Sequence, residues 1–123
     1  MGKLRHIALY ADDIEATAAF YEKAFELKRV LERDFAITLS DGVVSLAIVD
    51  ARRNAHGRTG LDHVGFLVDD MEAAAAKLVA AGSEHCGQIG RERANSNIER
   101  KYNDPNGLVF DIVTAEHARP VWG

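Results

Sequence analysis

The chain has 123 residues, of which 47% are hydrophobic and 28% charged, as is ordinary for one soluble globular domain. Its formal net charge of −4 argues against a nucleic-acid-binding surface, and no apolar run approaches the roughly 20 residues that a membrane span needs. The single cysteine, Cys86, cannot form an internal disulfide, and the N-terminal residues lack the apolar stretch of a secretory signal. We therefore expect a cytoplasmic protein that binds neither nucleic acid nor membranes.

A first module is predicted from about residue 4 to residue 50. Residues 6–11 are short and apolar, as in a strand, and Asp12-x-x-Glu15 then has the form of a helix capping box. Apolar residues recur at helical spacing as far as Phe25. Strands are predicted over 28–33 and 35–40, and Asp41-Gly42 predicts a hairpin turn into a further strand over 43–49.

A polar linker is predicted over about 51–60, and a second module over about 61–114. Residues 63–68 predict a strand, Asp69-x-x-Glu72 predicts a second capping box, and Gly82 predicts the end of the helix. The predicted strands that follow are 84–89, 97–103 and 108–114. The tail, residues 115–123, is expected to be peripheral, with the Trp122 side chain docked.

The two modules repeat each other at a spacing of 57 residues. Residues 6–24 and 63–81 share eight identities over 19 aligned positions, including the pattern H-x5-DD-x-E that begins at His6 and at His63. Both halves are predicted to run βαβββ. The sequence therefore predicts an α+β fold made of two βαβββ modules.

Strand periodicity places three potential metal ligands on the strand faces that point away from the helices: His6, His63 and Asp111. An ionised carboxylate among apolar neighbours is costly unless a cation or hydrogen bonds compensate it. Two imidazoles and one carboxylate suit a divalent ion and leave positions open for substrate or water. A structural role stays open, in which the histidines are hydrogen-bonded strand residues and Asp111 pairs with Lys101 or Arg100 across a hairpin.

These features resemble the vicinal oxygen chelate superfamily. The resemblance lies in the duplicated βαβββ unit, the H-x5-DD-x-E openings and the ending DPNGLVFDI (104–112). Members of this superfamily include glyoxalase I, methylmalonyl-CoA epimerase, extradiol dioxygenases, and fosfomycin- and bleomycin-resistance proteins. It implies that residues 1–123 form one domain whose sheets curl into a cup, paired between chains as a homodimer. It also implies one divalent metal ion per site (Mn, Fe, Ni, Co or Zn), held by His6, His63 and Asp111.

The resemblance does not select one characterised branch. Aligning the two hairpin turns places Leu46 opposite Asp111, where glyoxalase I and the epimerase normally carry a fourth metal ligand, and leucine cannot ligate. Lys101 stands where extradiol dioxygenases and fosfomycin-resistance proteins have a tyrosine. The three-ligand set of the fosfomycin-resistance proteins matches best in number, although the family usually has glutamate in place of Asp111.

The resemblance implies a metal-dependent enzyme that acts on a small oxygen-rich substrate, by lyase, isomerase, thiol-transferase or dioxygenase chemistry. Lys101 and Glu99 share a strand face and are candidate catalytic residues, since a lysine near a metal can bind an anionic substrate or act as an acid. Simple solvent exposure of Lys101 is the structural alternative. The alternative function is a metal-free small-molecule binding protein of the bleomycin-resistance kind, whose relatives generally lack the metal residues.

Overall fold

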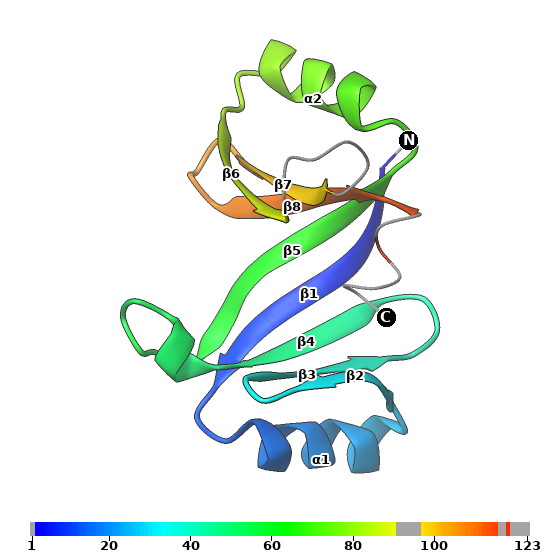
Figure 1. Ribbon diagram of the computed structural model, residues 1–123, viewed down its shortest axis with the longest axis vertical. Coiled ribbons are helices and arrows are strands. Elements are labelled where there is room, and N and C mark those ends of the chain that lie inside the picture. Colours follow the sequence, from blue (N-terminus) through cyan, green and yellow to red (C-terminus); the bar gives the residue numbers. More distant parts are fainter. Residues whose placement is uncertain (1, 91–96, 116–117, 119–123) are drawn as a thin grey trace. The chain divides into compact units, whose positions relative to one another are not determined.

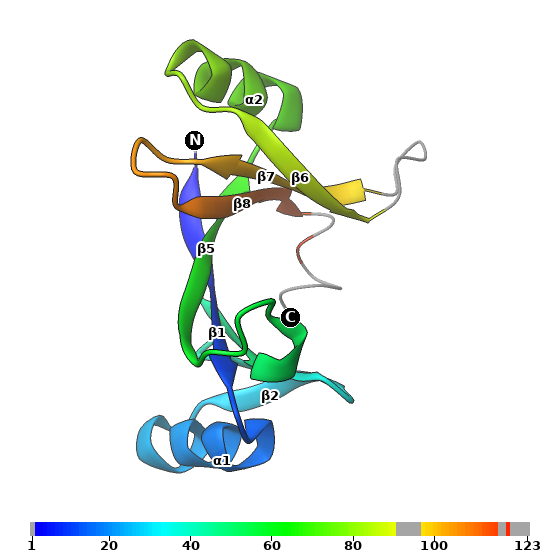
Figure 2. The same cartoon turned by 90° about the vertical axis from the view of Figure 1, so that its left-hand side faces the viewer.

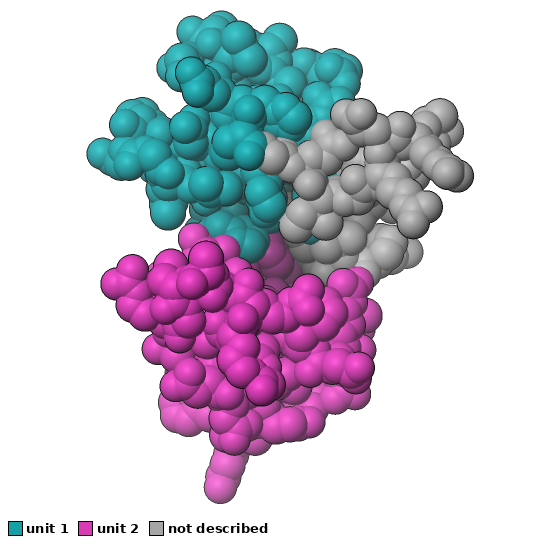
Figure 3. Space-filling view, turned by 60° about the vertical axis from the view of Figure 1, so that its left-hand side comes forward, with its two compact units in different colours: residues 1–5, 63–121 teal, residues 6–62, 122–123 magenta. Residues whose placement is uncertain are grey.

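The computed structural model describes residues 2–90, 97–115 and 118, with the backbone alone described at 87–90, 97 and 98. The chain divides into two compact units, which Figure 3 colours separately: unit 1 comprises residues 1–5 and 63–121, and unit 2 comprises residues 6–62 and 122–123. The predicted tail, with Trp122, lies outside the described residues except for Ala115 and Ala118.

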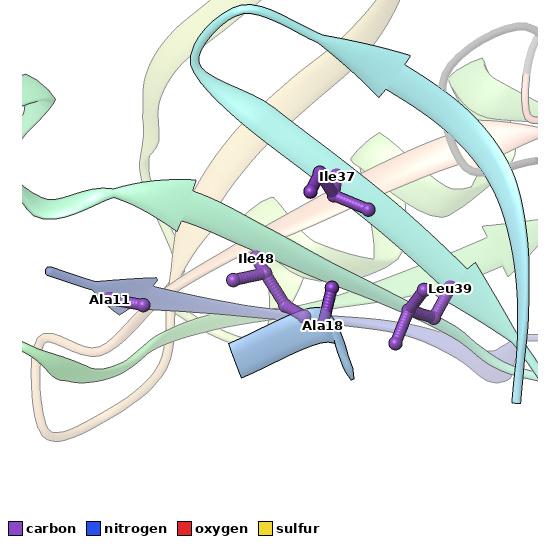
Figure 4. Close-up of a cluster of buried hydrophobic side chains, with 5 residues drawn as sticks. All are labelled: Ala11, Ala18, Ile37, Leu39 and Ile48. Carbon is purple, nitrogen blue, oxygen red and sulfur yellow. The ribbon is translucent and has the colours of Figure 1, made fainter. Parts of the chain in front are cut away.

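Unit 2 contains the first βαβββ module. Its elements are β1 (Lys3–Ala11, of which residues 6–11 belong here), α1 (Ile14–Phe25), β2 (Lys28–Arg33), β3 (Ala36–Ser40) and β4 (Ser45–Asp50). The strand order is β2-β3-β4-β1, in which β1 is parallel to β4 and the other pairs are antiparallel. Helix α1 packs on β3 and β4, and the core between them consists of Ala11, Ala18, Ile37, Leu39 and Ile48 (Figure 4).

Unit 1 contains the second module, with the same pattern. After the short 3-10 helix η1 (Ala51–Arg53) of unit 2, the chain forms β5 (Gly60–Val68), α2 (Met71–Ala80), β6 (His85–Gly90), β7 (Asn97–Asn103) and β8 (Val109–Thr114). The strand order is β5-β8-β7-β6, in which β5 is parallel to β8. Helix α2 covers one face of these strands, as Figures 1 and 2 both show, over a core of Val68, Tyr102 and Ile112.

The predicted α+β fold of two βαβββ modules is confirmed, and so are the predicted faces of the strands. Phe66 and Val68 of β5 pack toward α2, together with Phe110 and Ile112 of β8, so the residues between them face the other way. Gly82 follows α2 with a φ of +93°, a left-handed conformation that ends the helix as predicted. Within the described ranges, no helix has the length and apolar character that crossing a membrane requires.

The predicted capping boxes are wrong by one residue. The N-caps are Asp13 and Asp70, not Asp12 and Asp69, and each cap side chain accepts a hydrogen bond from the backbone N–H three residues further on, at 3.0 and 3.1 Å. Because each helix therefore begins one residue later, its glutamate lies too early to reach back to the cap. These glutamates form ion pairs instead, Glu15 with Arg29 at 2.7 Å and Glu72 with Arg100 at 2.6 Å.

Candidate functional site

A histidine and an aspartate meet on the face of unit 1 that points away from α2. The parallel pairing of β5 with β8 sets Gly65 opposite Asp111, so His63, two residues earlier on the same face of β5, lies near the aspartate. His63 Nε2 is 3.0 Å from Asp111 Oδ2. The Asp111 side chain is fully buried, whereas His63 keeps 16% of its side chain exposed.

Strand β7 brings two more polar side chains to the same face. Its antiparallel pairing with β8 sets Lys101 opposite Asp111, and the Lys101 ammonium donates to Asp111 Oδ1 at 2.6 Å. Glu99, two residues earlier on β7, is only 4% exposed and also hydrogen-bonds to Asp111. Solvent exposure of Lys101, the structural alternative, is wrong, since only 22% of its side chain is exposed. Four of the five predicted site residues thus lie together in unit 1.

The Asp111 carboxylate stays ionised in this cluster. Burial by itself raises the pKa of Asp111, but the contacts with His63 and Glu99, together with the charges of His63 and Lys101, hold that pKa below its ordinary value. The cluster therefore offers a buried anion in contact with an imidazole and an ammonium group.

One carboxylate oxygen of Asp111 is left without a hydrogen-bond donor. Among the described residues, no donor reaches the fully buried Oδ2 in hydrogen-bonding geometry, although His63 Nε2 lies 3.0 Å away. The His63 ring nitrogen lies beside this oxygen and helps to lower the pKa of Asp111. A buried oxygen in this state costs about 1–3 kcal/mol, and such an atom is where a cation is expected.

The fifth predicted residue, His6, lies in unit 2. The parallel pairing of β1 with β4 sets His6 opposite Ser45, and His6 Nδ1 is 2.9 Å from Ser45 Oγ. Both side chains are buried. The contact orients the imidazole ring through Nδ1. Ser45 was not identified from the sequence, because only the parallel pairing of two strands far apart in the chain reveals it.

The predicted counterpart of Asp111 in the first module is wrong by one residue. Ala8 lies opposite Ala47, and its repeat counterpart Gly65 lies opposite Asp111, so Ala47 and not Leu46 corresponds to the aspartate. Leu46 packs toward the core beneath α1. The alignment of the turns fails because the loop between β7 and β8 is one residue longer than the loop between β3 and β4. Neither alanine nor leucine can ligate a metal, so this position provides no fourth ligand.

The donor atoms match what a divalent ion requires. His6, His63 and Asp111 each offer one nitrogen or oxygen atom of the kind that ligates such an ion. His63 Nε2 and Asp111 Oδ2 lie 3.0 Å apart, so an imidazole nitrogen and a carboxylate oxygen are close enough that both could hold one ion. The imidazole and carboxylate chemistry fits Mn, Fe, Co, Ni and Zn alike. The residues present thus fit a metal, without selecting one.

Comparison with known proteins identifies a family. Residues 3–112 match the model of the Glyoxalase/Bleomycin resistance protein/Dioxygenase superfamily. No curated protein matches the sequence of the chain.

Solved structures share the fold at low sequence identity. A hypothetical protein from Bacillus halodurans has a TM-score of 0.73 and 15% identity, over 92% of this chain and 94% of that one. The Mn(II)-bound glyoxalase from Novosphingobium aromaticivorans has a TM-score of 0.70 and 18% identity, over 91% of this chain but 38% of that longer one. Methylmalonyl-CoA epimerase from Mycobacterium tuberculosis has a TM-score of 0.67 and 14% identity, over 90% and 86%. These similarities confirm a glyoxalase-like α+β fold.

Proposed function

Because the chain belongs to the Glyoxalase/Bleomycin resistance protein/Dioxygenase superfamily, we propose that it is a divalent-metal-dependent enzyme acting on a small oxygen-rich substrate. The observation that carries this proposal is the buried Asp111 Oδ2, which lacks a hydrogen-bond donor and lies 3.0 Å from His63 Nε2. A metal ion bound by both atoms would compensate the buried oxygen.

The proposed ligands are His6, His63 and Asp111, with one ion per site. His6 enters this set as the repeat counterpart of His63, and its contact with Ser45 holds the ring in one orientation. When bound, the ion would act as a Lewis acid that stabilises negative charge on two neighbouring substrate oxygens. Three protein ligands leave coordination positions for those oxygens, and Ala47 adds no fourth.

Lys101 and Glu99 are the proposed catalytic residues. Lys101 holds Asp111 through Oδ1, which leaves Oδ2 for the metal, and its ammonium is positioned to attract an anionic substrate group. Glu99 is buried on the same strand face, and a carboxyl group there could pass a proton to or from a substrate. The reaction type, whether lyase, isomerase, thiol transferase or dioxygenase, is left unspecified.

We further propose the organisation of the protein in the cell. Residues 1–123 would act as one vicinal oxygen chelate domain, with modules of about 4–50 and 61–114 joined by the linker 51–60. Pairing of two chains as a homodimer would complete each cup, and the partners would be a second copy and a small-molecule substrate. The single cysteine and the charge of −4 support a cytoplasmic protein that binds neither nucleic acid nor membranes.

A metal-free binding protein of the bleomycin-resistance kind is the second candidate. The observation that favours it is the ion pair between Lys101 and Asp111, at 2.6 Å, because an ammonium already compensates part of the buried carboxylate charge. In such a protein the cluster would hold the fold together, and a ligand would bind without a metal.

Metal analysis distinguishes the two functions. Protein purified without a metal-binding tag is expected to hold about one equivalent of a divalent metal per chain. His6→Ala, His63→Ala and Asp111→Asn should each lower that content at least tenfold, because each removes a ligand. His56→Ala is the matched control, since His56 lies exposed in the linker, and it should retain the metal.

The proposal fails if the protein takes up none of Mn, Fe, Ni, Co or Zn when each is supplied separately. It also fails if His63→Ala and His56→Ala retain equal amounts. The first result would assign the chain to the metal-free class, and ligands would then be sought by thermal shift. The second would show that His63 does not hold the metal.

A further inference from the structure

Unit 1 also contains a pocket, which lies on the opposite face of its strands from the polar cluster of His63, Asp111, Lys101 and Glu99. A pocket of about 420 Å³ lies between α2 and the strands β5 and β8. Its floor includes Val64, Phe66 and Phe110, and its roof is formed by Ala74 and Leu78 of α2. These strand residues alternate with His63 and Asp111, so the pocket is separate from the proposed metal site.

The pocket arises from a difference between the two repeats. In the first module Tyr21 and Phe25 of α1 stack on each other, with their ring centroids 6.4 Å apart. Their repeat counterparts are Leu78 and Gly82, so the second helix lacks both rings. Helix α1 buries Ala18 completely, whereas α2 contains no fully buried residue. Tyr21 packs against the core of the first module, whereas Phe25 is exposed, so the replacement of Tyr21 by Leu78 is what leaves space above the strands of the second module.

The walls of the pocket favour an apolar ligand. Phe66 and Phe110 meet edge to face at 5.7 Å on the floor, and apolar side chains form most of the remaining lining. A cavity of this size with aromatic walls is typical of small-molecule sites. The charged lining residues are Lys77 and Asp104, and the Asp104 carboxylate already accepts two backbone N–H bonds in its own turn.

The rim of the pocket is acidic. A smaller hollow of about 240 Å³ shares Lys77 and Ala74 with the first and adds the carboxylates of Asp69 and Asp70. Together with Asp104, three carboxylates and the Lys77 ammonium lie among the described residues that line the two hollows. The mostly apolar lining of the larger pocket favours an uncharged ligand.

We propose that the pocket beneath α2 is a binding site for an uncharged aromatic or aliphatic small molecule. The site is independent of the proposed metal centre. Its ligand would add to the stability of the α2 interface, because it would fill the open volume between α2 and the strands.

Fluorescence titration with N-phenyl-1-naphthylamine, an uncharged aromatic probe, tests the site. The wild-type chain, with EDTA present, should bind the probe saturably at about one per chain. Ala74→Phe places a ring in the pocket and should weaken binding at least tenfold. Ala76→Phe makes the same change on the exposed side of α2 and should leave binding unchanged. The anionic probe 1-anilinonaphthalene-8-sulfonate should bind at least tenfold more weakly than the uncharged one.

Circular dichroism shows whether Ala74→Phe folds. If it does not fold, Val64→Phe takes its place, because this variant blocks the pocket from the strand side. The proposal is overturned if no saturable binding occurs, or if the folded pocket variants bind the probe as well as Ala76→Phe does. Binding that disappears as protein concentration rises would also overturn it, because a second copy would then cover the pocket. These titrations are done with EDTA present. Their outcome is therefore independent of whether the chain binds a metal.

Discussion

Replacing Lys101 by methionine should destabilise the metal-free protein by about 2–3 kcal/mol at pH 7. The variant keeps the length of the side chain but removes the ammonium 2.6 Å from Asp111 Oδ1. Breaking a fully buried ion pair costs about 3–5 kcal/mol, and a hydrogen bond to a charged group contributes about 1.5–3 kcal/mol. The lower range applies here because 22% of the Lys101 side chain is exposed and solvent screens part of the charge.

The pH dependence of this loss follows from Asp111. Its folded pKa lies below the ordinary value, so the carboxylate contributes stability above its unfolded pKa, and that contribution disappears as the pH falls through the folded pKa. Lys101→Met raises the folded pKa toward the unfolded value. The gap between wild type and variant should therefore be widest near neutral pH and should narrow in acid, because Asp111 is protonated at a higher pH in the folded variant than in the folded wild type.

Urea denaturation in the presence of EDTA, at pH 7 and at several pH values down to 3, measures both effects. Lys28→Met is the control, because Lys28 is exposed on β2 and its replacement should change the unfolding free energy by less than about 0.5 kcal/mol. Equal stability of Lys101→Met and Lys28→Met at pH 7, or a gap that stays constant into acid, would refute the argument that the ammonium compensates Asp111.

Three further outcomes are expected. Ser45→Ala should lower metal affinity about 10- to 100-fold, measured by competition with a chelator, because it frees the His6 ring to rotate while keeping the ligand. Asp13→Ala should lower the free energy of unfolding, measured by thermal denaturation, by about 1 kcal/mol, because Asp13 caps α1. Asp12→Ala should lower it by less than about 0.3 kcal/mol, and equal losses would contradict the observed cap. Ile48→Ala should cost about 3 kcal/mol and Ile48→Val about 1 kcal/mol in urea, because the side chain is completely buried; losses below about 1 kcal/mol for both would show that this core tolerates cavities.

The fold was predictable because its signals are local. Strand alternation and helical spacing each depend on residues a few positions apart, and the repeat at 57 residues confirmed that both halves follow one plan. The proximity of Lys101 to Asp111 also followed from local pairing, since β7 and β8 form a hairpin joined by a short turn. Alternation then placed Glu99 on the same face, two residues away.

The predictions that failed placed a role one residue away from the residue that has it in the structure. The caps shifted from Asp12 to Asp13 because two adjacent aspartates offer equivalent side chains, and only the backbone geometry decides which one precedes the helix. The counterpart of Asp111 shifted from Leu46 to Ala47 because the two hairpin loops differ in length. An offset of one residue in a strand moves a side chain to the other face, so such an error changes the chemistry that is assigned to a position.

The sequence by itself determined the order of the elements, the faces of the strands and the family resemblance, because these depend on periodicity and on residue types. The tertiary structure decided that Lys101 is paired rather than solvated, that Ser45 orients His6, and that the shorter side chains of α2 leave a pocket above Phe66 and Phe110. Those features depend on distances between segments far apart in the chain and on how completely their side chains fill the space between them. Such distances and volumes are properties of packing, which no local pattern of residues encodes.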